Sequence, residues 1–116
     1  MFRSLLDYAM FTVDLYSTPD GRVPVIDWLQ SLTSGKSATR IADRLDRVAS
    51  GQLGDVRAVG DGVWELRCHF RPGYRVDYSR VGEALDVLLC GGDKSTQKRD
   101  IVTAKRYLAD YKGRAK

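Results

Sequence analysis

The sequence predicts a single α+β domain, in which helices pack against a mainly antiparallel β-sheet. Its 116 residues match the length of one domain. Apolar residues recur with the period of an amphipathic helix in three segments, and they alternate with polar residues in several others. Short turn sequences connect the last strands, so these strands should run antiparallel. The predicted order of elements is β-α-α-β-β-β-α.

The first half of the chain should contain one strand and a helical hairpin. Alternation predicts a strand over residues 10–16, followed by a turn that contains Pro19 and Gly21. Residues 24–34 have apolar positions at helical spacing, and Gly35 should end that helix. A second helix is expected over residues 37–49, with its arginines mostly facing outward.

The second half should contain three strands and a C-terminal helix. The strands are expected over residues 56–70, with a turn or bulge at 60–62, and over 74–81 and 84–90. Asp93 or Ser95 can cap the last helix, which should run to about Tyr111. Its expected buried stripe consists of Ile101, Ala104, Leu108 and Tyr111.

A second methionine, Met10, stands directly before the first predicted strand. Residues 1–9 are therefore expected to be an N-terminal extension, either a loosely held arm or the result of an alternative start, and 10–116 form the domain. No apolar run has the length of a membrane span or a signal peptide. The expectation is a cytoplasmic protein without a membrane partner, in which Cys68 and Cys90 are buried, reduced thiols.

Ionisable residues gather on one predicted face of the strand that ends near residue 70. With a period of two, Trp64, Leu66, Cys68 and Phe70 should face the core. The opposite face then carries Glu65, Arg67, His69 and Arg71, which include the only histidine of the chain. Such a face would suit a small nuclease or an anion-binding module, and an ordinary solvated face is the alternative.

Positive charge is concentrated at the C-terminus. The whole chain carries a net charge of +4, whereas the segment from Lys94 onward holds eight basic and two acidic residues, a net +6. A basic helix of this kind indicates a nucleic acid or an acidic partner, and a solvated lysine face is the alternative.

Four ordered segments together resemble one toxin family. They are GQLGDV at 51–56, VWELR at 63–67, PGYRVDY at 72–78 and LLCGGDKSTQ at 88–97. In this order they resemble the RelE/ParE toxin superfamily, and more closely its HigB-like addiction-module killer proteins. The similarity extends from Phe11 to Tyr111 and implies a RelE-like fold for the domain.

The resemblance implies the toxin of a bacterial type II toxin–antitoxin system. Many such toxins are endoribonucleases that cut messenger RNA on the ribosome, and others poison DNA gyrase. The implied partners are messenger RNA, the ribosome and a cognate antitoxin, commonly a helix-turn-helix DNA-binding protein. A degenerate toxin that only binds its antitoxin is a third reading.

The resemblance also implies roles for single residues. Arg75 matches the arginine placed on the scissile phosphate, Arg67 matches one that holds the RNA backbone, and Lys94 lies near a basic residue on the leaving-group side. The chain has Val63 and Glu65 where nuclease members have two lysines, and the histidine or tyrosine of the last helix has no clear counterpart.

Cleavage by the 2′-hydroxyl of RNA requires a base, cations over the phosphate and an acid. Glu65 or His69 could be the base, although Glu65 could instead form an ion pair with Arg67 or Arg75. No metal or cofactor is expected. The predicted catalytic residues are Arg75, Arg67, Glu65 and Lys94, and the predicted RNA contacts are His69, Arg71, Lys98 and Arg99.

Overall fold

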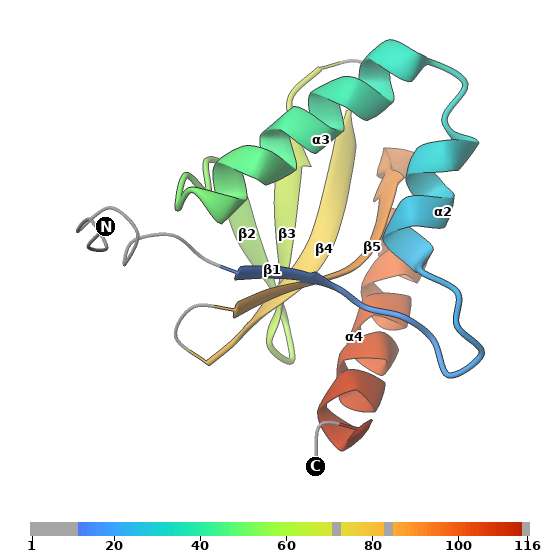
Figure 1. The fold of residues 1–116 in the computed structure, drawn as a ribbon, viewed down its shortest axis with the longest axis vertical. Helices are drawn as coiled ribbons and strands as arrows, with labels where there is room; N and C mark the ends of the chain where they lie inside the picture. Colours follow the sequence, from blue (N-terminus) through green and yellow to red (C-terminus); the bar gives the residue numbers. More distant parts are fainter. Residues whose placement is uncertain (1–11, 71–72, 83–84, 115–116) are drawn as a thin grey trace, which may run out of the picture.

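The computed structural model describes residues 12–70, 73–82 and 85–114. The predicted extension at residues 1–9 lies outside these ranges. Within them the chain forms three α-helices, one 3-10 turn and five strands (Figure 1). In chain order these are β1 (Thr12–Leu15), α2 (Pro24–Ser31), α3 (Gly35–Ala49), β2 (Val56–Gly60), β3 (Val63–Cys68), β4 (Tyr74–Val81), β5 (Leu85–Asp93), η1 (Lys94–Thr96) and α4 (Gln97–Arg114).

The strands form a single sheet in the order β1-β5-β4-β3-β2. Neighbouring strands from β2 to β5 are antiparallel, and β1 pairs with β5 in parallel. The predicted α+β class, the mainly antiparallel sheet and the C-terminal helix are thus confirmed. Gly35 begins α3 rather than ending α2, because Ser34 caps α3 by accepting a hydrogen bond from the Ser37 N–H.

The segment predicted as one strand over residues 56–70, with a turn or bulge at 60–62, folds as the β2–β3 hairpin, so the turn is confirmed and the single strand is wrong. Asp61 and Gly62 have φ values of +53° and +83°, the left-handed conformation that a tight two-residue turn requires. The chain therefore reverses, and Arg57 lies opposite Glu65. The predicted order was consequently one strand short.

The glycine pair after the predicted strand 84–90 does not end that strand. β5 continues through Gly91 and Gly92 to Asp93. A Cβ atom on Gly91 would collide with the Trp28 ring, and one on Gly92 would collide with the Asp100 carboxylate. Glycine is needed here because α2 and α4 approach the sheet closely.

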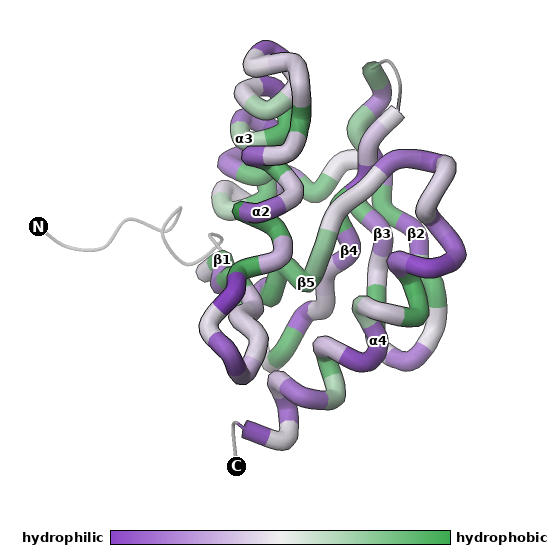
Figure 2. The backbone as a smooth tube through the Cα atoms, turned by 90° about the vertical axis from the view of Figure 1, so that its right-hand side faces the viewer, coloured by the Kyte–Doolittle hydropathy of each residue, from purple (hydrophilic) through white to green (hydrophobic). Residues whose placement is uncertain are grey.

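Both faces of the sheet are covered. One core lies between the sheet and helices α2 and α3, and it includes Val25, Ile41, Leu66 and Val76. A second core includes Leu108 and the other buried residues that pack beside α4. Figure 2 shows that α2 and α3 lie on one side of the strands and that α4 lies on the other side.

The two predicted faces of β3 need correction. Glu65 lies on the predicted polar face but is only 1% exposed, because the sheet has a helix on that side also. Trp64, predicted to be core, is 39% exposed. It lies two positions from Gly62, near the β2–β3 turn, and that turn is at the end of the sheet away from α3 (Figure 1).

None of the helices in the described part of the chain combines the length and the apolar character needed to cross a bilayer.

Candidate functional site

A buried ionic cluster joins the centre of the sheet to the start of α4. Arg75 on β4 has a side chain that is only 5% exposed. Its Nε lies 3.1 Å from Glu65 Oε2, and its Nη2 lies 2.9 Å from Asp100 Oδ2 and 3.8 Å from Asp77 Oδ2. The ion pair between Glu65 and Arg75 that the sequence allowed is therefore present. One buried guanidinium faces three carboxylates, so the cluster itself is rich in negative charge.

Asp77 is the carboxylate of this buried ionic cluster that lies farthest from the Arg75 guanidinium. Its nearest cation is 3.8 Å away, and its Oδ1 is buried without a hydrogen bond from the described residues. Its Oδ2 accepts a hydrogen bond from the Cys90 thiol. Burial raises the pKa of Asp77 to about 6, against the lowering influence of Arg75, and the nearby Glu65 carboxylate raises it further. A proton on Asp77 would relieve the excess negative charge.

An open cleft of about 370 Å³ lies beside this cluster, and we call it the β3–β4 cleft. It is bounded by the strands β2, β3 and β4 and by the first residues after β5. The lining residues are Arg57, Glu65, Arg67, Cys68, His69, Gly73, Tyr74, Arg75, Lys94 and Gln97. Four of them are cationic and one is anionic, so the cleft is suited to an anion.

The structure brings most of the predicted site residues together in the β3–β4 cleft. Glu65, Arg67, His69, Arg75 and Lys94 all line it. Glu65 and Arg67 lie on β3, Arg75 lies on the neighbouring β4, His69 follows β3, and Lys94 lies in η1. Pairing of the strands brings these separate parts of the chain together.

The remaining predicted RNA contacts lie outside the cleft. Lys98 and Arg99 are exposed at the start of α4, where they line a neighbouring hollow that shares Lys94 and Gln97 with the cleft. Arg71 lies outside the described residues.

The cations of the cleft differ in how accessible they are. The side chains of Arg67 and Arg57 are 36% and 51% exposed, and Lys94 is exposed. Glu65 Oε1 lies 3.5 Å from both Arg57 Nη2 and Arg67 Nε. Arg75 lies beneath them, so Arg57, Arg67 and Lys94 are the groups that a ligand in the cleft would meet.

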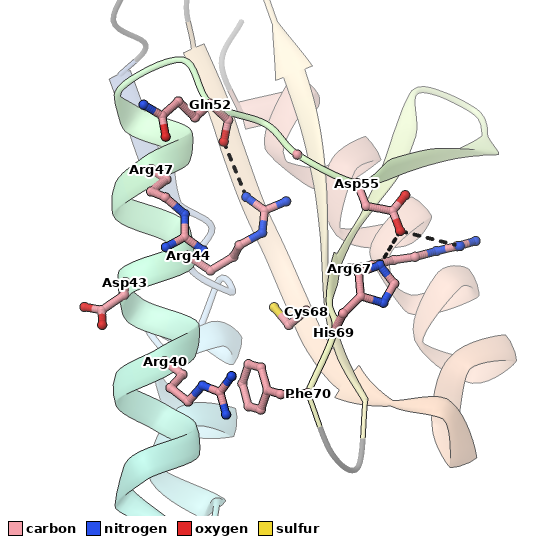
Figure 3. Close-up of a pocket in the computed structure, with 11 residues that line it drawn as sticks. Arg40, Asp43, Arg44, Arg47, Gln52, Asp55, Arg67, Cys68, His69 and Phe70 are labelled. Atoms are coloured by element: carbon pink, nitrogen blue, oxygen red, sulfur yellow. Dashed lines mark hydrogen bonds and ion pairs between the residues drawn. The ribbon is translucent and has the colours of Figure 1, made fainter.

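His69 is paired with a carboxylate that the sequence analysis missed. Its Nε2 is hydrogen-bonded to Asp55 Oδ2, which also lies 3.8 Å from Arg67 Nη1 (Figure 3). The hydrogen bond to His69 lowers the pKa of Asp55 below its ordinary value. Among the described residues, none forms a hydrogen bond with Nδ1 of His69, so this nitrogen is available to a ligand.

The β2–β3 hairpin explains why Asp55 was missed. The Arg67 N–H donates to the Asp55 carbonyl over 3.0 Å, so the hairpin places Asp55 beside the end of β3. A single strand over 56–70 would have kept these residues far apart. Recognition of the tight turn at Asp61 and Gly62 was the available signal.

Residues at the start of α4 close one side of the cleft. The Asp93 carboxylate accepts a hydrogen bond of 2.8 Å from the Ser95 N–H, so Asp93 is the cap. The first turn is the 3-10 turn η1, and Lys94 therefore precedes α4 rather than lying in its first α-helical turn. The Gln97 side-chain amide donates a hydrogen bond of 2.8 Å to Glu65 Oε2, which fixes the start of α4 against β3 at this side of the cleft. Gln97 and Asp100 were also absent from the predicted site.

The arrangement can bind a phosphodiester and move a proton beside it. Arginine guanidinium groups bind phosphate oxygens in a bidentate manner. A histidine oriented by a carboxylate is a common general acid or base. In the described part of the chain, no group of three or more histidine, cysteine or carboxylate side chains is arranged to hold a metal ion.

Comparison with known proteins gives one informative match. An uncharacterized protein of Haemophilus influenzae is 44% identical to this chain over 78 residues, which cover 67% of the chain and 79% of the relative. No model of a known protein family matches the chain.

Proposed function

We propose that this chain, which belongs to the same family as the uncharacterized Haemophilus influenzae protein, is an RNA-cleaving toxin of a type II toxin–antitoxin system. The observation that carries the proposal is the β3–β4 cleft, where accessible cations lie beside a histidine paired with a carboxylate. The order of its four sequence segments supports the toxin family. The proposed substrate is messenger RNA, and the reaction uses the 2′-hydroxyl of the RNA rather than a metal-bound water.

His69 is the proposed general base. When Nε2 carries the proton and donates a hydrogen bond to Asp55, the neutral ring leaves Nδ1 as an acceptor. Nδ1 can then take the proton from a 2′-hydroxyl placed in the cleft, and the attacking 2′-oxygen forms the new bond to phosphorus. The bond between phosphorus and the 5′-oxygen breaks, and the 5′-oxygen leaves with the electron pair and takes up a proton from water, which leaves a 2′,3′-cyclic phosphate on the upstream product. Asp55 holds the ring in the required tautomer and stabilises the charge that the ring gains.

Arg67, Arg57 and Lys94 are the proposed phosphate ligands. Their charges lie where negative charge builds on the phosphate oxygens during attack. Arg75, expected from the resemblance to contact the scissile phosphate, is instead a positioning residue in this proposal. It neutralises Glu65, and Glu65 holds Arg57 and Arg67 at the rim of the cleft.

A direct cleavage assay tests the proposal. Purified protein is incubated with a labelled single-stranded RNA in the presence of a chelator, with and without translating ribosomes, beside the all-2′-deoxy strand. We expect the RNA to be cleaved and the all-2′-deoxy strand to stay intact. The upstream RNA product should carry a 2′,3′-cyclic phosphate. His69→Ala should lower the rate by about 10²–10⁴, and Arg67→Ala should lower it by about 10²–10³. The exposed Arg22, remote from the cleft, gives the control variant Arg22→Ala.

Growth provides the cellular test. Induction of the chain alone should arrest bacterial growth, and co-expression of a cognate antitoxin, a helix-turn-helix protein by the resemblance, should relieve the arrest. Two results of the cleavage assay would contradict the proposed mechanism. One is cleavage of the all-2′-deoxy strand at the rate of the RNA, and the other is full activity of folded His69→Ala and Arg67→Ala.

The burial of Arg75 favours a second candidate. With its guanidinium enclosed by carboxylates, the cation that the resemblance assigns to the scissile phosphate is not exposed to a ligand. A toxin that binds without cleaving, by poisoning gyrase or by retaining only antitoxin binding, fits that observation. Intact RNA ends after induction, together with loss of gyrase supercoiling activity, would select the gyrase poison. Intact ends with normal supercoiling would select the antitoxin-binding module.

A further inference from the structure

A second cleft of about 480 Å³ lies on the other side of the end of β3, and we call it the α3 cleft. One wall is the face of α3 that carries Arg40, Arg44 and Arg47. The opposite wall is formed by the last residues of β3 and those that follow it, together with the loop that leads into β2. Figure 3 shows the three arginines along α3, with Asp55, Arg67 and His69 across from them.

The charges of the α3 cleft are unevenly satisfied. Arg44 is buried, and its guanidinium donates to the backbone carbonyls of Gln52 and Leu53, so it holds the loop. No carboxylate among the described residues forms an ion pair with it. Arg40 and Arg47 are exposed, and in the described part of the chain neither forms an ion pair. They are available to an anion that enters the cleft.

The acidic residues of the α3 cleft do not cancel this charge. Its lining contains four arginines and two aspartates, Asp43 and Asp55. Asp55 is already engaged by His69 and Arg67. The cleft therefore presents a positive surface along one side of α3.

An aromatic pair connects the two clefts. The Arg40 guanidinium lies 4.0 Å from the centre of the Phe70 ring, and the rings of Phe70 and Tyr74 are 5.6 Å apart. Phe70 lines the α3 cleft, whereas Tyr74 lines the β3–β4 cleft. Aromatic rings beside a positive groove are the elements that bind single-stranded nucleic acids, because bases stack while cations follow the backbone.

The two clefts also share part of their walls. Arg67, Cys68 and His69 line both of them, so a ligand that leaves one cleft at the end of β3 enters the other. We propose that the α3 cleft is a second RNA subsite, in which Arg40 and Arg47 hold the phosphates of nucleotides next to the scissile bond and Phe70 stacks with a base. This inference rests on the proposed function of the β3–β4 cleft.

An acidic peptide is the other polyanion that the charges could accept. Arg40 over the Phe70 ring, with the tilted Tyr74 ring beside it, favours RNA, since a base gains from stacking on a ring or a guanidinium plane and a carboxylate does not. The continuity with the β3–β4 cleft favours RNA as well.

Fluorescence anisotropy tests the subsite with two probes. One is a labelled single strand of about eight nucleotides, long enough to enter both clefts, and the other is a dinucleotide that fills only the β3–β4 cleft. Both carry a 2′-deoxy sugar at every position so that they bind without being cleaved. The variant Arg40→Ala/Arg47→Ala changes only exposed side chains, and a melting curve checks its fold.

We expect the double variant to bind the longer strand about tenfold more weakly and the dinucleotide as wild type does. The slope of log K against log salt should fall by about 1.4, since each phosphate contact with a single strand contributes about 0.7. Phe70→Leu should weaken binding of the longer strand without changing that slope. Lys36→Ala, on the same helix and exposed but lining neither cleft, is the matched control and should have no effect.

The possible failures are distinguishable. If the double variant binds the longer strand as wild type does, while Arg67→Ala loses binding of both probes, the subsite is refuted and the β3–β4 cleft remains. If wild type binds neither probe, the subsite and the proposed function both fail. An acidic peptide titrated in parallel distinguishes the other polyanion. If the double variant loses binding of this peptide and keeps binding of the longer strand, the α3 cleft is a protein-binding groove and the proposal is overturned.

Discussion

Replacement of Asp77 by asparagine should stabilise the protein at neutral and alkaline pH. Asp77 is fully buried, shares one arginine with Glu65 and Asp100, and has one oxygen without a hydrogen bond from the described residues. Burial raises its pKa from 3.8 to about 6. The folded chain therefore binds this proton more tightly than the unfolded chain does.

The sign of the pH dependence follows from that difference. Below the unfolded pKa of 3.8, Asp77 is protonated in both states and carries no penalty. As pH rises toward the folded pKa of about 6, the unfolded state releases the proton first and the free energy of unfolding falls. A shift of about two pKa units corresponds to about 3 kcal/mol. This penalty is fully present above pH 7.

Asp77→Asn removes the charge at nearly constant volume. Part of the gain is offset by the weakened contacts with Arg75 and the Cys90 thiol, so we expect a net stabilisation of about 1–2 kcal/mol at pH 8. At pH 4.5 the gain should be close to zero. Urea unfolding followed by circular dichroism at the two pH values measures the difference.

A control with the opposite sign is available. Hydrogen bonds from Ser95 lower the pKa of Asp93, so its contribution to stability is present at neutral pH and is lost as the solution becomes acidic. Asp93→Asn should therefore have a lower free energy of unfolding than wild type at pH 8, and the difference should be smaller below about pH 4. An Asp77→Asn gain that is equal at pH 4.5 and 8, or larger at pH 4.5, would refute the reasoning about the buried carboxylate.

Three further predictions test the packing and the partner. Leu108 is 2% exposed in the core beside α4, so Leu108→Ala should lower the free energy of unfolding by about 2–5 kcal/mol in urea melts. Gly91→Ala should displace the Trp28 ring, cost about 1–3 kcal/mol and change the near-ultraviolet dichroism of the tryptophans; an unchanged spectrum would contradict it. Charge reversal at the exposed Lys98 and Arg106 should slow association with a cognate antitoxin at low salt in stopped-flow measurements, and an unchanged rate would mean that this face of α4 is merely solvated.

Local patterns predicted which segments are helices and strands. The amphipathic spacing of α3 and α4 and the alternation along β4 depend only on neighbouring residues, and these elements appear where they were expected. The β2–β3 turn is also encoded locally, in Asp61 and Gly62, and the sequence pattern allows a turn or a bulge there without deciding that the strand is divided in two. Only the divided strand places Asp55 beside Arg67 and His69, so the prediction of a single strand leaves Asp55 out of the site.

Sequence alone brought Glu65, Arg67, His69, Arg75 and Lys94 forward as one group, and the structure gathers them around one cleft. Alternation could assign these side chains to a face of the sheet. It could not show that helices cover this face of the sheet as well as the other, because coverage depends on where the distant helix α4 packs.

The tertiary structure decided which charges meet water. Gln97 and Asp100, more than twenty residues from Arg75 along the chain, enclose its guanidinium when α4 packs on the sheet. Arg67 is on the neighbouring strand, directly opposite Arg75, and stays accessible at the rim. The sequence determined the residue types and their alternation, whereas the burial of Arg75 and the raised pKa of Asp77 arise from removal of water by a remote segment.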